Sequence, residues 1–598
     1  MPLVGIPVSR LKQLLGKDLD RDDLQVALEN LGNDVDGYAV VKRFRCDRCG
    51  EITEVLEHED FNDLCAGCAG GDLVEIGSAE VVRIDLLPVR PDMLSAAGLA
   101  RALRGFLGIE TGLPEFKLSD SGFRVEVKSG MDEIRPYIVG AIVRGLRLGD
   151  EGLRMVMKMQ ENLHWALGRN RRRASIGVYD LGTIEPGFVF RPVKPDELKF
   201  VPLFGLPDSP RAELTPKQIL KKHPKGIGYA HLLAGMSTYP LLTDSAGKVL
   251  SMPPIINSDD TKMTPETTDV FIDVTGPDRN AITRSLNVLV AALADMGGNV
   301  GKVEIKYPDG TSETTPDLTP ARCELDPAEA RRVLGLDLDA GKIAELLRKM
   351  RYGAKTEGSK VVVDIPAYRS DILHEQDIIE DIAIGYGYHN IEPRLVPTMT
   401  VSRALPVEEI SEAVRRVMTG FGLFEVMTSV LVSEKEQFEL MRLPVTPHVT
   451  LENPVSVEQT MLRTSLIPGL LSTFRANSTR EMPQQIFECQ DVFFLDSGAE
   501  TGVRTRRRVA VGLTGPKVGF ADVRALASAL ARELNAEAAF TAANHHSFIT
   551  GRCARIDTRG EDTGILGEMH PEVLERFGLG QPVAVFEFEL DHFIKAYA

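Results

Sequence analysis

Four cysteines near the N-terminus have the residue type and spacing of a metal site. Cys46 and Cys49 form one Cys-x-x-Cys pair, Cys65 and Cys68 form a second, and 15 residues separate the pairs. Two such knuckles can present four thiolates tetrahedrally to Zn²⁺, and four cysteines leave no open coordination position. The spacing therefore predicts a structural zinc. The alternative is a polar loop with four unligated thiols.

A second group of candidate ligands is acidic and lies in the stretch RSDILHEQDIIEDIAIGYGY, residues 369–388. A helix that starts near His374 would place three carboxylates at i, i+3 and i+4 on one face, with a fourth one turn earlier. The opposite face would pack into a core through Ile378, Ile379, Ile382 and Tyr386. Hard oxygen ligands suit Mg²⁺, but a solvated acidic face at a helix N-terminus is also consistent with the spacing. The candidates are Asp371, Asp377, Glu380 and Asp381.

The composition excludes several classes of protein. The 598 residues carry a formal net charge of −17, which argues against nucleic-acid binding by the whole surface and leaves room for local basic patches. No apolar run approaches the ~20 residues of a membrane-spanning helix, and the start MPLVGIPVSRLKQ lacks the features of a signal peptide. Seven cysteines, an odd number with four in Cys-x-x-Cys pairs, do not resemble a secreted disulfide framework. We expect a cytoplasmic protein without membrane contact.

The elements that must position these residues alternate between helical and strand-like patterns, which predicts an α+β multidomain fold. The segments 308–320 and 392–400 are rich in turn and linker residues and are expected to be linkers. The expected domains are 1–112 with an insert at about 42–77, 113–313, a compact module at 316–393, and 398–598.

Motifs along the whole chain carry a family resemblance. They include RPDMLSAAGLARAL, QENLHWALGRNRRRASIGVYDLGTIEP, VLSMPPIINSDDTKMTPETTDVFIDVTGPD, residues 361–388, NPVSVEQTMLRTSLIPGLL and GILGEMHPEVLERFG. In this order they resemble the beta subunit of phenylalanyl-tRNA synthetase, a class II aminoacyl-tRNA synthetase, in its archaeal and eukaryotic-type branch. The resemblance implies an N-terminal domain, an editing domain, a winged, DNA-binding-like module and a C-terminal class II synthetase-like antiparallel-sheet domain. The four-cysteine insert is not part of the family pattern.

The resemblance also implies an activity and partners. We expect an α2β2 heterotetramer in which the alpha subunit binds ATP and attaches phenylalanine to tRNA(Phe). The family pattern assigns Asp371, Asp377, Glu380 and Asp381 to Mg²⁺ shared with the alpha subunit. The end QPVAVFEFELDHF lacks the Gly-rich run and the arginine that would grip ATP, so the C-terminal domain is expected to have no active site of its own. The alternative is a stand-alone tRNA-binding or trans-editing protein that acts without the alpha subunit.

The editing domain is expected to hydrolyse mischarged tyrosyl-tRNA(Phe), because an apolar pocket rejects an added hydroxyl only about a hundredfold. Such a site needs an acceptor for the phenol hydroxyl, and the candidate is Asp244. Candidates for the ester and the terminal ribose are Asn257, Ser258 and Thr261. Turn chemistry is the other explanation for all four residues. The tRNA backbone could be held by Arg169, Arg171, Arg172 and Arg173, which could equally form a solvated turn.

Overall fold

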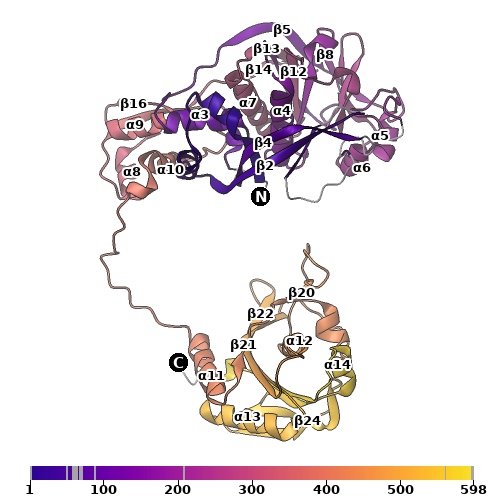
Figure 1. The fold of residues 1–598 in the computed structure, drawn as a ribbon, viewed down its shortest axis with the longest axis vertical. Helices are drawn as coiled ribbons and strands as arrows, with labels where there is room; N and C mark the ends of the chain where they lie inside the picture. The colour runs from indigo at the N-terminus through magenta and orange to yellow at the C-terminus, as the bar shows by residue number, and fades with distance from the viewer. Residues whose placement is uncertain are drawn as a thin grey trace. The chain divides into compact units, whose positions relative to one another are not determined.

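The computed structural model describes residues 3–48, 52–56, 65, 72–85, 89–206, 209–558 and 560–593. The chain divides into two compact units, Met1–Arg394 and Leu395–Ala598, which are drawn separately in Figure 1. The division lies inside the segment 392–400 that was expected to be a linker. Within the described ranges, every helix is too short or too polar to cross a bilayer.

A four-stranded antiparallel sheet in the order β1-β4-β2-β3 opens the first unit. Strands β2 and β4 form a long arm, with β3 beside the outer part of β2, and the arm pairs Cys46 with Leu73. Apolar side chains of the helices, such as Leu11, Leu24 and Leu99, are buried in a core shared with β1 and β4. The elements are β1 (Leu3–Pro7), α1 (Val8–Leu15), α2 (Arg21–Asn30), β2 (Asp34–Cys46), β3 (Ile52–Leu56), β4 (Leu73–Asp85) and α3 (Ala96–Phe106).

A mixed ten-stranded sheet forms the middle of the first unit, in the order β11-β10-β9-β8-β5-β13-β6-β12-β7, with β14 beside β13. Helices α4 and α7 pack on one face of this sheet (Figure 1). The other face carries an aromatic core around Phe188 and Phe271. The elements are β5 (Leu118–Val127), β6 (Tyr137–Arg144), α4 (Gly149–Trp165), β7 (Ser175–Asp180), β8 (Phe188–Val193), α5 (Pro216–Lys222), α6 (Pro224–Tyr229), β9 (Tyr239–Asp244), β10 (Val249–Met252), β11 (Ile256–Asn257), β12 (Val270–Gly276), α7 (Arg279–Asp295), β13 (Asn299–Lys306) and β14 (Ser312–Thr315).

The expectation of a linker at 308–320 is wrong for its central part. Residues Ser312–Thr315 form strand β14, which pairs antiparallel with β13. The β-branched residues Thr314 and Thr315 suit a strand, and the buried Thr315 hydroxyl bonds to both backbone groups of Gly140 at 2.9 and 2.7 Å. The Pro and Asp content that indicated a linker belongs to the flanking turns.

The first unit ends in a small module with a three-stranded sheet, β15-β17-β16, and three helices. Helix α10 begins at Glu375 with His374 as its cap, as the carboxylate spacing predicts. Ile378, Ile379 and Ile382 are at most 1% exposed, which confirms that this face is the core side. The elements are β15 (Ala321–Leu325), α8 (Pro327–Leu334), α9 (Ala340–Lys349), β16 (Gly353–Glu357), β17 (Lys360–Ile365) and α10 (Glu375–Tyr386).

The second unit contains a seven-stranded sheet in the order β18-β21-β22-β26-β25-β24-β23, antiparallel except where β18 runs parallel to β21. Helices α11 and α13 cover one face and α12 and α14 the other, so each face has its own core. The elements are α11 (Pro406–Gly420), β18 (Phe424–Glu425), β19 (Leu431–Val432), β20 (Met461–Leu462), α12 (Ile467–Ala476), β21 (Gln484–Leu495), β22 (Val503–Thr514), α13 (Phe520–Glu533), β23 (Ala538–Ala542), β24 (Phe548–Thr558), β25 (Glu561–Met569), α14 (Pro571–Arg576) and β26 (Val583–Glu589). The molecule is therefore a multidomain α+β protein.

Candidate functional site

Asp244, the residue predicted to accept a phenol hydroxyl, ends strand β9 and is 2% exposed. Its Oδ1 accepts hydrogen bonds from the backbone amides of Ala246 and Lys248 at 3.0 and 2.8 Å. Its Oδ2 accepts one from the amide of Glu185 at 3.0 Å. Three backbone amides thus hold this carboxylate, which is the turn chemistry that the sequence left open.

The residues predicted to hold the ester lie on the next connection. Ser258 and Thr261 are 1% and 0% exposed, and the Thr261 hydroxyl lies 3.5 Å from the carbonyl of Ser258. The Ser258 hydroxyl accepts from the amide of Asp260 at 3.3 Å and caps a short 3₁₀ turn. Asn257 pairs with Ser251 across β10 and β11. The Ser258 hydroxyl also lies 3.4 Å from the carbonyl of Val201, so these contacts hold the connection in the fold, and a role in holding an ester stays a prediction.

The structure draws attention instead to Asp273 in the centre of strand β12. This carboxylate is 1% exposed and shares the aromatic face of the sheet with Phe271, two residues away. It lies opposite Gly140 of β6 on one side and opposite Gly177 of β7 on the other. Opposed residues share one face of a sheet, and a glycine in a strand marks a place where another group approaches closely. A β-carbon at Gly177 would collide with both the Tyr179 hydroxyl and the Asp273 carboxylate.

The hydrogen bonds of Asp273 link three strands. The Tyr179 hydroxyl donates to Oδ1 of Asp273 at 2.5 Å and lies 2.8 Å from Oγ of Ser251 on β10. Arg135 is 5% exposed and donates to Oγ1 of Thr275 at 2.8 Å. Burial raises the pKa of Asp273 to about 7, and the Tyr179 hydrogen bond and the Arg135 charge oppose that rise only in part. A buried carboxyl group that titrates near neutrality is typical of functional sites.

Aromatic rings line the same face beside this carboxylate. Phe188 stacks on Phe271 with ring centroids 3.9 Å apart, and Tyr179 stacks on Phe271 at 5.9 Å.

Asp273 was not among the site residues predicted from the sequence, because the spacing of residues along one strand does not show which residues of other strands lie beside it. A usable signal was present nonetheless, since VFIDVTG places one carboxylate in an otherwise apolar strand that must be buried.

The four predicted tRNA-binding arginines have different environments. Arg171 is 7% exposed and donates to Oε1 of Glu161 at 2.7 Å. Arg173 is paired with Asp278. Arg169 and Arg172 are exposed, and neither forms an ion pair within the described ranges. The structure therefore separates one buried arginine, Arg171, from three exposed ones, of which Arg173 is paired with Asp278.

The four acidic residues of the predicted Mg²⁺ site do not form one ligand set within this chain. Asp371 accepts from Nε and Nη2 of Arg369 at 2.9 and 2.6 Å, and Asp381 lies 2.7 Å from Nη1 of the same side chain. Oδ2 of Asp377 caps α10 by accepting from two backbone amides, both at 2.7 Å. Glu380 is exposed. In the described part of the chain, no three His, Cys, Asp or Glu side chains gather as metal ligands.

Half of the predicted zinc ligands can be placed. Cys46, at the end of β2, and Cys65 are each 1% exposed and share a small buried cluster with Leu73. Cys49 and Cys68 lie outside the described residues. The placed cysteines are therefore together and buried, and the complete ligand set stays a prediction.

Comparison with known proteins places these sites in a family. Residues 159–290 match the B3/4 domain, residues 323–388 the tRNA synthetase B5 domain, and residues 391–590 the phenylalanyl tRNA synthetase beta chain CLM domain. The chain is 42% identical to the phenylalanine–tRNA ligase beta subunit of Archaeoglobus fulgidus over 86% of this chain and 91% of that protein. It is 40% identical to the Thermococcus kodakarensis beta subunit, over 90% and 96%. The chain belongs to the phenylalanine–tRNA ligase beta subunit family.

A solved structure supports the family assignment for the first unit. An N-terminal fragment of the Pyrococcus horikoshii phenylalanyl-tRNA synthetase beta subunit is 35% identical and superposes with a TM-score of 0.56. The superposed region covers 64% of this chain and 99% of the fragment. In this beta subunit family member, Asp273, Tyr179 and Ser251 all lie within the matched B3/4 domain, and Arg369 and α10 lie within the B5 domain.

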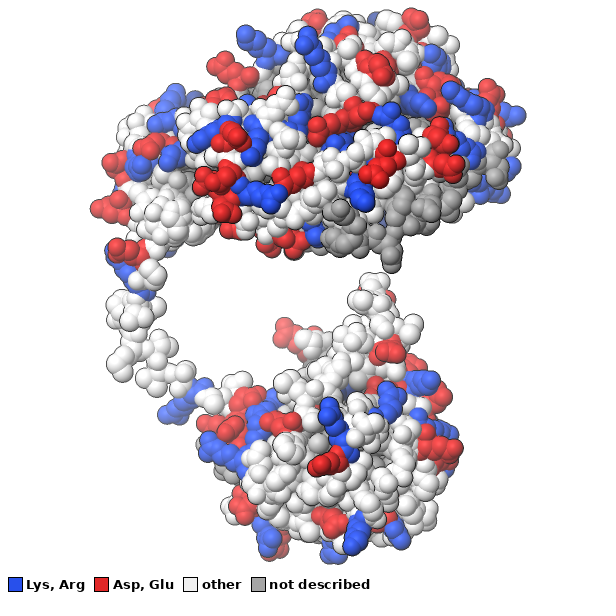
Figure 2. Space-filling model, in the orientation of Figure 1, with Lys and Arg blue, Asp and Glu red and all other residues white. Residues whose placement is uncertain are grey.

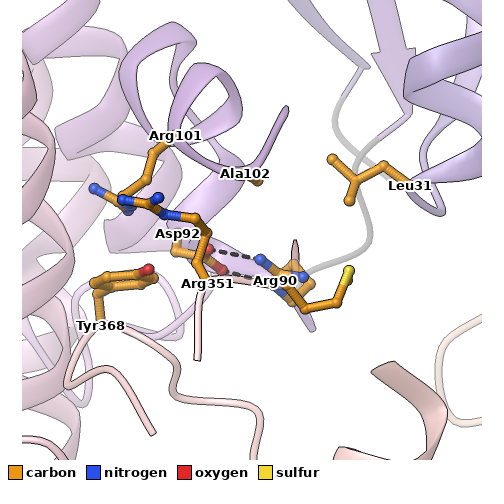
Figure 3. Close-up of a pocket in the computed structure, with 8 residues that line it drawn as sticks. Leu31, Arg90, Asp92, Arg101, Ala102, Arg351 and Tyr368 are labelled. Atoms are coloured by element: carbon orange, nitrogen blue, oxygen red, sulfur yellow. Dashed lines mark hydrogen bonds and ion pairs between the residues drawn. The ribbon is translucent and has the colours of Figure 1, made fainter. Parts of the chain in front are cut away.

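A buried charge network joins the B5 domain of this beta subunit to its N-terminal part. Arg90 and Asp92 form two hydrogen bonds of 2.9 and 2.8 Å, with Arg101, Arg351 and Tyr368 around them (Figure 3). Burial raises the pKa of Asp92, but the neighbouring arginines, Arg90 first and then Arg369 and Arg101, together lower it below its usual value. A cavity of about 10 Å³ lies among these residues and could hold at most about one water. The network serves to join domains.

Proposed function

We propose that this chain is the beta subunit of a phenylalanine–tRNA ligase that works with an alpha subunit in an α2β2 complex. The alpha subunit would bind ATP and attach phenylalanine to tRNA(Phe), and the B3/4 domain of this chain would hydrolyse tyrosyl-tRNA(Phe). The match over three successive domains and the names of the relatives support a subunit over a stand-alone editing protein.

The C-terminal unit supports a role in assembly. Its buried charges are used internally: Arg463 and Glu488 are 2% and 0% exposed and lie 2.7 Å apart. Glu587, on the central strand β26, accepts from the amide of Leu466 at 2.6 Å and lies 3.1 Å from Nη1 of Arg508. Charged groups that are already neutralised inside the fold are poorly placed to grip ATP.

The proposed editing reaction needs a group that distinguishes tyrosine from phenylalanine. Asp273 is the observation that carries this proposal, because it is a buried acceptor beside aromatic rings and two glycines. The Tyr179 hydroxyl bonds to it at 2.5 Å, so a phenol group has the right chemistry for this carboxylate. A phenylalanyl group cannot make that hydrogen bond, and sites built around such a bond discriminate strongly.

The test compares two carboxylates in the α–β complex. The complex should hydrolyse tyrosyl-tRNA(Phe) faster than phenylalanyl-tRNA(Phe). Assayed above the raised pKa of about 7, where the Asp273 carboxyl is ionised, Asp273→Asn should reduce this preference by about tenfold or more, because a hydrogen bond to a charged group contributes ~1.5–3 kcal/mol. Asp244→Asn is the matched control, and we expect it to lower stability with the preference kept. The reverse result would transfer the acceptor role to Asp244.

Metal binding is proposed only for the insert. The donor set of four thiols suits Zn²⁺, and the shared burial of Cys46 and Cys65 supports it. The carboxylates around α10 do not fit a resident Mg²⁺, because Arg369 already supplies the cation between Asp371 and Asp381. No step of the proposed reaction is therefore assigned to a metal on this chain.

A further inference from the structure

The turn that follows α4 is held in an uncommon backbone conformation. Arg169, Asn170 and Arg171 have φ angles of 46°, 53° and 65°, three left-handed residues in a row. Each such residue costs on the order of 1 kcal/mol when it is not glycine, so a run of three persists only where the surroundings enforce it. Gly168 is part of the constraint, because a β-carbon there would lie 2.5 Å from the carbonyl oxygens of His164 and Ala174.

Arg171 anchors the turn from inside. Its guanidinium donates to Oε1 of Glu161 at 2.7 Å and to the carbonyl of Ile255 at 2.9 Å, and it lies 4.5 Å from the ring centroid of Tyr229. Arg135 donates to the carbonyl of Arg171 at 3.4 Å. Because Arg135 also bonds to Thr275 on β12, the turn is linked through this one side chain to the strand that carries Asp273.

The anchored turn leaves cations and an aromatic ring exposed. Arg169 and Arg172 face solvent on either side of the buried Arg171. Trp165, the last residue of α4 and the single tryptophan of the chain, is 40% exposed. Lys225 lies near the same turn. Burial would raise the pKa of Glu161, but the surrounding charges lower it, and Lys225 is close enough to be one of them. Arg169 and Arg172 follow Trp165 closely in the chain, and exposed aromatic rings and cations are the groups that bind single-stranded nucleic acid, by stacking on bases and pairing with phosphates.

We infer that Trp165, Arg169 and Arg172 bind the single-stranded 3′ end of tRNA, with the indole stacked on a base and the arginines on phosphates. This inference rests on the proposed editing function, since the turn lies in the same B3/4 domain as Asp273 and is linked to β12 through Arg135. Figure 2 shows Lys and Arg interspersed with Asp and Glu over the visible face. The visible face therefore has no large basic patch, and the affinity for RNA must come from a local surface such as Trp165, Arg169 and Arg172.

The single tryptophan makes the inference directly measurable. The full-length chain is titrated with uncharged tRNA(Phe) and with a short single-stranded RNA while its tryptophan fluorescence is recorded. Base stacking on Trp165 should quench the fluorescence, and no other tryptophan can contribute to the signal. Trp165→Ala should weaken binding about tenfold, measured by fluorescence anisotropy of labelled RNA, and Trp165→Phe should restore most of it.

The arginines are tested by their salt dependence. Arg169→Gln with Arg172→Gln should lower the slope of log K against log salt by about 1.4, the expected value for two phosphate contacts on single-stranded RNA. The matched control is Arg124→Gln with Lys306→Gln, which removes the same charge from exposed positions on β5 and β13. We expect the control to keep the wild-type slope.

The outcomes separate this inference from the proposed function. Quenching and weakened variants without any hydrolysis of tyrosyl-tRNA(Phe) would support the RNA surface and contradict editing. Normal hydrolysis without quenching, with unchanged activity in Trp165→Ala, would overturn the RNA surface and leave editing in place. Quenching by the alpha subunit in place of RNA would also overturn it, and would identify a protein interface.

Discussion

Asp273 shows how one residue can couple folding to pH. Burial raises its pKa from 3.8 to about 7, so between those values the folded chain holds a proton that the unfolded chain has released. The stabilising contribution of this proton is complete below pH 3.8 and is lost progressively as the pH rises toward 7. The shift of about 3 pKa units corresponds to roughly 4 kcal/mol.

The first prediction follows from this proton. Asp273→Asn should flatten the fall in unfolding free energy between about pH 4 and pH 7, because the amide does not titrate. Urea unfolding of the full chain across this range measures the effect. The exposed Asp132→Asn is the control and should keep the wild-type profile. Identical pH profiles for Asp273→Asn and the wild type would contradict the raised pKa.

Gly177 tests the geometry around the same carboxylate. Gly177→Ala should destabilise the first unit by about 1–3 kcal/mol, because the methyl group would displace the Tyr179 hydroxyl or the Asp273 carboxylate. Gly228→Ala is the control, since a β-carbon there meets nothing within 4 Å. Thermal unfolding compares the two variants. Equal stability would mean that the space beside Asp273 can expand at no cost.

At the scale of elements, helix α10 is held by an internal cation. Arg369 has 2% of its side chain exposed, and it joins Asp371, just before the helix, to Asp381 in the helix. The Tyr352 hydroxyl donates to the second carboxylate at 2.5 Å. Four carboxylates in one segment would repel one another in isolation, and the arginine and the helix cap relieve most of that repulsion.

The third prediction concerns this arginine. Arg369→Met should destabilise the first unit by about 3–5 kcal/mol, because two buried carboxylates lose their partner. Arg322→Met, which removes one partner of an exposed pair, should change stability by less than about 1 kcal/mol. Wild-type thermal unfolding should be the same with Mg²⁺ and with a chelator of divalent ions. A large stabilisation by Mg²⁺ alone would restore the metal hypothesis.

The β2–β4 arm provides the fourth prediction. Its Arg43 and Arg45 lie beside Glu151 and Asp150 of α4, so the arm contacts the helix that leads to Trp165. Purified protein should contain about one zinc per chain, and Cys46→Ser with Cys49→Ser should remove it. Proteolysis should then cut the insert first, while the other domains resist. An intact insert in metal-free protein would contradict the zinc site.

At the scale of the whole molecule, exposed apolar side chains are concentrated near the start of the second unit. Leu395, Met399 and Val455 are 96%, 95% and 99% exposed, and Met427 is 83% exposed. Large apolar side chains that are this exposed are the kind that a partner protein covers. They lie in the region matched to the CLM domain, which agrees with the proposed alpha subunit as that partner.

The fifth prediction uses this region. Coexpression with an alpha subunit should give a complex with the mass of two copies of each chain. Hydrogen exchange should slow at residues 395–405 and 455–457 in the complex, and exchange in the core strand β12 should not change. A monomeric chain with unchanged exchange would favour the stand-alone alternative.

The sequence by itself determined the features that depend on spacing along one segment. The Cys-x-x-Cys pairs, the start and core face of α10, the α+β character and the family motifs can all be read from neighbouring residues. Local periodicity is enough for these because each one is a property of a single element.

Only the tertiary structure decided which polar groups meet. Asp273 faces Gly140 and Gly177 through the strand register, and these partners come from segments about a hundred or more residues away. The same holds for the arginines: Arg171 is buried by Glu161 and Tyr229, whereas its neighbour Arg172 in the same run is exposed. The burial of a residue depends on what the rest of the chain packs against it, and burial in turn sets its pKa and decides whether its charge faces solvent. The spacing of residues within one segment does not contain that information.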